Sequence, residues 1–154
     1  MNTTHDNARD MLRGHMNGAL DRVIANLHAL DALAKMSAGG YATQDDWDAL
    51  GGGVQDTLWG LGVERDERGD WDVDAAEQQL IDDLDPLAIT YEKGKPFDVA
   101  LTIGGPNIYL VDFGGHGGAQ LRGAWGSGWE TITGPNVTRA VEFYREQARE
   151  AFGD

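Results

Sequence analysis

Residues 87–133 form the segment with the clearest structural pattern and read LAITYEKGKPFDVALTIGGPNIYLVDFGGHGGAQLRGAWGSGWETIT. Apolar and β-branched residues recur in it at every second position, which is typical of half-buried strands. Glycine-containing links of three to five residues separate these segments, so consecutive strands should pair as antiparallel hairpins. The stretch predicts an antiparallel meander of four or five strands, over residues 87–93, 97–103, 108–113, 119–125 and 129–133.

The same alternation predicts which strand residues share a face. Val99, Leu101 and Ile103 should lie on one face of their strand. On the next strand Ile108 and Leu110 should share a face, and the residues at 109 and 111 should point the other way.

Helical periodicity flanks the predicted sheet on both sides. Over residues 8–35 the apolar side chains are spaced by three and four, which places them on one helical stripe. Thr43 begins a second helix, with a break expected at the glycines 51–53, and a third helix ends before Pro86. A last helix covers residues 135–152.

This order of about three helices, four or five strands and one helix defines an α+β protein, because strands and helices do not alternate. We expect the C-terminal helix to pack on the sheet. Residues 1–85 form an acidic helical region, and residues 86–154 form the antiparallel sheet with its helix. The two regions are expected either as separate domains or as one compact domain.

The charge of the chain excludes several classes of function. Its 154 residues contain 26 Asp and Glu against 12 Lys and Arg, a net charge of −14. Direct binding to nucleic acid or to an anionic membrane surface needs a basic face, so both are disfavoured. The acidity is local, because residues 64–85 hold ten acids and only two arginines.

Cysteine usage and the N-terminal residues exclude further possibilities. The chain has no Cys, which rules out disulfides, thiolate zinc sites and cysteine nucleophiles. Residues 1–20 mix acids, bases and His without an apolar run, so neither a signal peptide nor a membrane span is expected. The expected location is the cytoplasm.

Three short motifs resemble catalytic or metal-binding signatures, and each lacks the residues that would complete it. The D-x-D-x-D run that starts at Asp70 has Ala75 and Ile81 where a calcium loop needs glycine and glutamate. The Asp-Phe-Gly tripeptide at 112–114 matches the magnesium-binding motif of kinases, but no other kinase motif accompanies it. The glycine loop around His116 resembles a phosphate-binding loop, but such a loop leads into a helix and this one leads into a predicted strand. We therefore expect that the chain is not an enzyme and that it binds no metal or cofactor. The alternative is a small hydrolase or transferase that uses His116 with Asp112.

A family resemblance rests on two segments of the sheet. Residues 101–109 read LTIGGPNIY, and residues 121–126 read LRGAWG ahead of a closing acidic helix. This half of the chain resembles a group of small acidic proteins of bacterial phages and mobile elements that share a GGPN-aromatic hairpin and a later W-G strand. Some proteins of that size, charge and setting are anti-CRISPR or anti-restriction inhibitors. The resemblance implies a mobile-element setting in a bacterial host cell.

Charge and resemblance together predict an anti-defence inhibitor of the anti-CRISPR kind. Its partner would be a host CRISPR effector or another nucleic-acid-processing protein, and its closely spaced carboxylates would mimic DNA phosphates. The alternative from another class is a phage structural, assembly or interaction protein. The candidate contact residues are the phosphate surrogates Asp66, Glu67, Asp70, Asp72, Asp74, Asp82 and Asp83, the aromatic anchor Trp71, and the sheet aromatics Tyr109, Trp125 and Trp129.

Overall fold

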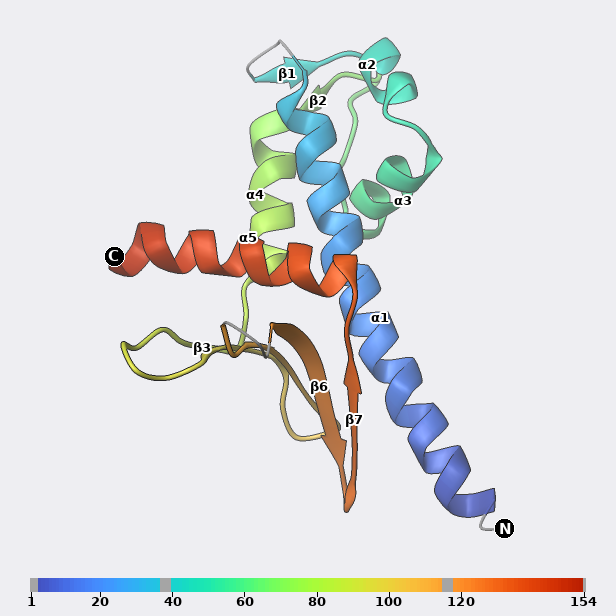
Figure 1. The fold of residues 1–154 in the computed structure, drawn as a ribbon. Helices are drawn as coiled ribbons and strands as arrows, with labels where there is room; N and C mark the ends of the chain where they lie inside the picture. The colour runs from blue at the N-terminus through green and yellow to red at the C-terminus, as the bar shows by residue number, and fades with distance from the viewer. Residues whose placement is uncertain (1–2, 37–39, 115–117, 154) are drawn as a thin grey trace. The chain divides into compact units, whose positions relative to one another are not determined.

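The protein is described by a computed structural model that covers residues 3–36, 40–114 and 118–153, with side chains from residue 7 onward. It forms two compact units. We call Val23–Asp85 the acidic unit, and residues 1–22 together with residues 86–154 the sheet unit. Helix α1 (Thr3–Ala34) contributes residues to both units (Figure 1).

The architecture is α+β, as the sequence predicts. N-terminal helices precede a five-stranded antiparallel sheet with the order β3-β4-β5-β6-β7, and a C-terminal helix packs on that sheet. The strands are β3 (Ala88–Thr90), β4 (Phe97–Thr102), β5 (Asn107–Asp112), β6 (Ala119–Trp125) and β7 (Gly128–Ile132), and the C-terminal helix is α5 (Pro135–Phe152).

The acidic unit holds three short helices and a strand pair besides its part of α1. The helices are α2 (Gln44–Ala49), α3 (Gly52–Gly60) and α4 (Val73–Leu84). The predicted break at the glycine run is confirmed, because Gly51 lies between α2 and α3 at a φ of 88°, which favours glycine. The predicted helix start at Thr43 is also confirmed, and it is a capping box: the Thr43 hydroxyl accepts from the Asp46 N–H, and the Asp46 carboxylate accepts from the Thr43 N–H.

Strand β1 (Tyr41–Ala42) pairs antiparallel with β2 (Trp71–Asp72), a contact that the sequence analysis did not predict. Two-residue strands are too short to show alternation, so sequence periodicity cannot detect them. The pair fixes Trp71 within the core of the unit, together with Leu58, Leu80 and Leu33, which are almost fully buried.

In the sheet unit, one sheet face is covered and the other is open. The covered face carries Val99, Leu110 and Leu121, which are fully buried side by side on β4, β5 and β6. Helix α5 packs on β5 and β6 with Val137, Ala140, Val141, Tyr144 and Ala148 buried (Figure 1). The apolar stripe of α5 therefore closes the core of the unit.

The first turns of α1 pack on the same face at Gly123. A Cβ atom placed on Gly123 would lie 2.6 Å from the Met16 sulfur and 3.2 Å from a Leu12 methyl carbon. Because real Cβ atoms do not approach that closely, glycine at this β6 position allows α1 to reach the sheet.

A register shift on β4 overturns part of the predicted face assignment. Ala100 pairs with Tyr109, but Thr102 pairs with Ile108, so Leu101 is the extra residue of a bulge. The prediction that Val99, Leu101 and Ile103 share a face is therefore wrong, because the bulge interrupts the alternation after Val99. The assignment on β5 is confirmed, since Ile108 and Leu110 are buried on the covered face.

Candidate functional site

The acidic unit concentrates the charge of the chain. Within residues 23–85 there are fifteen Asp and Glu against three Lys and Arg, a net charge of −12 of the total −14. Every one of the fifteen acidic residues is at least partly exposed. The candidate site is therefore a surface of many carboxylates and not a cleft with a few.

Several of these carboxylates stabilise the local fold. Asp66 accepts from the backbone N–H groups of Arg68 and Asp70 at 2.8 and 2.9 Å and so closes the turn before β2. Asp72 accepts from the N–H of Ala75 at 3.1 Å as the N-cap of α4. Asp83 accepts from the amide of Asn26 at 2.7 Å. Substituting these three would disturb the fold as well as the charge.

Other carboxylates have no such structural role. Among the described residues, no hydrogen bond or ion pair engages the side chains of Glu64, Glu67, Asp74 and Glu77. Glu64 and Glu67 lie on the loop between α3 and β2, and the other two lie on α4. Of the predicted phosphate surrogates, Glu67 and Asp74 are thus exposed and uncommitted, whereas Asp82 accepts from Gln78 at 2.8 Å.

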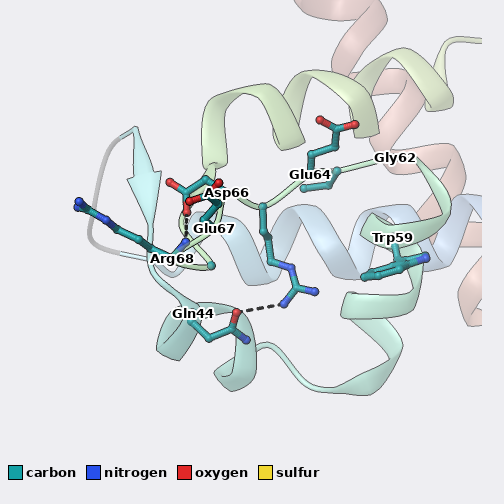
Figure 2. A pocket seen from close by; sticks show the side chains of 10 residues that line it. Gln44, Trp59, Gly62, Glu64, Asp66, Glu67 and Arg68 are labelled. Atoms are coloured by element: carbon teal, nitrogen blue, oxygen red, sulfur yellow. Dashed lines mark hydrogen bonds between the residues drawn. The ribbon is translucent and has the colours of Figure 1, made fainter.

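A surface pocket of about 610 Å³ lies on the loop between α3 and β2 (Figure 2). The guanidinium of Arg65 lies 4.6 Å from the ring centroid of Trp47 and 5.7 Å from that of Trp59, and it donates to Gln44 Oε1 at 3.2 Å. Gly69 lines the pocket at a φ of 84°, where a Cβ would overlap the Gln44 Oε1 atom. The loop is held to α2 and α3 by Arg65 and by this close approach.

The prediction that Trp71 is an aromatic anchor for a partner is wrong, because its side chain is only 1% exposed. Its indole N–H donates to the carbonyl of Thr43 at 3.1 Å, and its ring meets Trp47 edge to face at 5.4 Å. The exposed tryptophan of this surface is Trp59, which is 67% exposed beside Glu64 and Arg65 in the pocket lining. Trp59 is not among the residues predicted from the sequence, although it follows Leu58 directly on the helix and therefore lies outside the apolar stripe.

The three sheet aromatics do not form one surface. Tyr109 pairs with Arg122, and Trp129 pairs with Ala124, which places both rings on the open face of the sheet. Trp125 follows Ala124 directly and therefore points to the other face. There its ring meets the His15 ring of α1 edge to face at 5.4 Å.

The open face carries a recess of about 300 Å³ bordered by Tyr109, Trp129, Arg122 and Asp98. Trp129 is 67% exposed. Partial burial raises the pKa of the Asp98 carboxyl above its ordinary value, and among the described residues no donor reaches that carboxylate. The Arg122 guanidinium lies 5.6 Å from the Phe113 ring centroid, and no carboxylate of the described part of the chain pairs with it.

The enzyme alternative rests on His116, which lies outside the described residues. Its predicted partner Asp112 is already engaged, because one carboxylate oxygen accepts from the Gly114 N–H at 2.8 Å and the other forms an ion pair with Arg145. Within the described ranges no group of three or more His, Asp or Glu side chains could hold a metal ion. No described helix is long and apolar enough to cross a membrane.

Comparisons with protein-family models, with curated proteins and with solved structures found no match to this chain. The resemblance to mobile-element proteins therefore stays a prediction from the sequence.

Proposed function

We propose that the chain is an anti-defence inhibitor that binds a nucleic-acid-handling protein of a bacterial host, with the acidic unit in the place of a nucleic acid. The observation that carries this proposal is the net charge of −12 on 63 contiguous residues, with every carboxylate at least partly exposed. The bacterial setting and the choice of a CRISPR or restriction system come from the resemblance of the sheet half.

The mechanism we infer is occupation of a Lys- and Arg-lined channel. A channel that holds DNA is built to neutralise closely spaced phosphates, and B-DNA carries one charge about every 1.7 Å along its axis. Uncommitted carboxylates such as Glu64, Glu67 and Asp74 can meet the same cations without disturbing the turn and cap that Asp66 and Asp72 maintain. Opposite charge would speed association and make it sensitive to salt.

Charge alone gives little affinity once salt screens it, so an anchor is needed. Trp59 fits that role because its ring is exposed and lines the same pocket as the uncommitted Glu64 (Figure 2), and the Arg65 guanidinium lies 5.7 Å from its centroid. Burying an indole at the centre of an interface is among the largest single contributions to protein binding.

The test compares two triple variants with the same change in net charge. Glu64→Lys, Glu67→Lys and Glu77→Lys alter the acidic unit, and Glu142→Lys, Glu146→Lys and Glu150→Lys alter α5 in the sheet unit. Phage plaquing is measured in bacteria with an active CRISPR or restriction system that express the parent or a variant. We expect the parent and the α5 variant to restore plaquing and the acidic-unit variant to lose that effect.

Folding of each variant is checked by circular dichroism, so that loss of effect is not mistaken for loss of structure. With the purified defence complex, the parent should also compete with target DNA for binding, and competition should weaken as salt is raised. Equal restoration of plaquing by both triple variants would show that the acidic unit is not the contact.

A further inference from the structure

The open face of the sheet carries groups that have no hydrogen-bonding or ionic partner among the residues that the structure describes. Asp98 on β4 and Arg122 on β6 flank the central strand β5, and neither has an oppositely charged partner among the described residues. Tyr109 lies between them on β5, and Trp129 on β7 exposes two thirds of its surface. A face with one acid, one base and exposed aromatic rings is complementary to itself.

The placement of these groups suits a two-fold axis that runs along β5, parallel to the sheet. Such an axis exchanges the β4 and β6 sides, so Arg122 of one copy lies over the β4 side of the other copy, where Asp98 stands. The two positions differ by one step of two residues along the strand, since Asp98 pairs with Val111 and Arg122 pairs with Tyr109. The Arg122 side chain covers this step, because it extends from the level of Tyr109 past Val111 and its guanidinium lies over the Phe113 ring.

The same axis brings bulky and small side chains together. It carries Trp129 from β7 to the β3 side of the other copy. On that side the open face has Ala88 of β3, which is exposed, next to Ala100 of β4, which is already buried within the chain. Small residues there leave room for an indole, and face-to-face sheets pack about 10 Å apart with interdigitated side chains.

We propose that the open face of the sheet binds a second copy of this chain, with Asp98 of each copy paired to Arg122 of the other and Trp129 packed over the exposed Ala88 of β3. The sheet unit suits this contact because its net charge is only −2, so self-repulsion at the face is small. The contact uses all five strands, and with about five residues per strand it spans roughly 20 by 17 Å, which is small for a protein interface. The dimer should therefore be weak and concentration-dependent.

The test is sedimentation velocity of the purified chain from about 5 to 500 μM in 0.15 M salt, a range chosen for a small interface. We expect the parent to shift from monomer to dimer across this range. Trp129→Ala should weaken the dimer at least tenfold, whereas Trp125→Ala, which removes a tryptophan from the other face, should leave it unchanged.

A charge swap tests the reciprocal pairing. Asp98→Arg alone and Arg122→Asp alone should each set like charges against each other and abolish the dimer, and the double variant should restore it. A parent that stays monomeric at 500 μM would overturn the proposal, and so would a dimer that tolerates Trp129→Ala. If a single charge variant fails to fold, the comparison of Trp129→Ala with Trp125→Ala still decides. None of these outcomes depends on the plaquing assay.

Discussion

At the scale of single residues, Gly123 is the position where the sheet unit tolerates least change. A methyl group there would overlap the side chains of Met16 and Leu12, both of which are almost fully buried. We expect Gly123→Ala to lower the free energy of unfolding by about 1–3 kcal/mol, because overpacking forces neighbours out of their rotamers. Urea denaturation followed by circular dichroism measures this.

Gly14→Ala is the matched control for Gly123→Ala. Gly14 lies on α1 of the same unit, and a Cβ there meets nothing within 4 Å. Alanine is a better helix former than glycine by up to about 1 kcal/mol, so this variant should be neutral or more stable. Equal destabilisation by both substitutions would contradict the close packing at Gly123.

At the scale of elements, the contact between α1 and β7 depends on one buried carboxylate. Glu130 is 7% exposed, and it accepts from Arg9 at 2.7 Å and from Arg13 at 2.9 Å. The two arginines lie one helical turn apart on α1, so both reach the same strand residue. Chiefly through the hydrogen bond from Arg9, they hold the pKa of the Glu130 carboxyl below its ordinary value.

The lowered pKa of Glu130 predicts a pH dependence with a definite sign. Its stabilising contribution is complete above the pKa of the unfolded chain, about 4.3, and is lost as the pH falls through the lower pKa of the folded state. Glu130→Gln should therefore cost about 1–3 kcal/mol at pH 7. The difference from the parent should shrink below pH 4, as measured by urea denaturation at each pH.

Glu142→Gln serves as the control for this pH dependence, because Glu142 is exposed on α5 and no described residue pairs with it. Its free energy of unfolding should differ little from that of the parent, both at pH 7 and below pH 4. A Glu130→Gln difference that stays constant with pH would contradict the ionic role of the carboxylate.

How far the sequence predicts these elements depends on the strength of each local signal. Strand β6 matches its predicted range because its residues alternate clearly between apolar and polar. Helix α5 matches its predicted range because it begins at a proline and carries a continuous apolar stripe. The bulge at Leu101 follows no sequence rule, since it depends on how β4 and β5 close their hairpin. The sequence indicates an exposed Trp71 because its neighbours are polar, whereas pairing of β1 with β2 buries it in the core.

At the scale of the whole molecule, the uneven charge should appear as a dependence of stability on salt. Fifteen carboxylates against three cations repel one another within the acidic unit, and salt screens that repulsion. We expect Glu64→Gln, Glu67→Gln and Glu77→Gln together to raise the melting temperature at 10 mM salt and to have little effect at 1 M. Differential scanning calorimetry at both salt concentrations measures this.

The matched control is Glu142→Gln, Glu146→Gln and Glu150→Gln on α5, where the local charge is nearly balanced. This set should change the melting temperature less at low salt. If the acidic-unit set lowers the melting temperature instead, its carboxylates stabilise the fold, and their availability for a partner becomes doubtful.

The division of α1 between two units has a consequence for synthesis on the ribosome. The acidic unit is one contiguous segment, so it can fold as soon as residue 85 has emerged. Leu12 and Met16 of α1 are made before that segment, but the glycine of β6 against which they pack is made long after it. Until the strands emerge, the earliest apolar stripe of the nascent chain has no sheet to cover it and is open to chaperones.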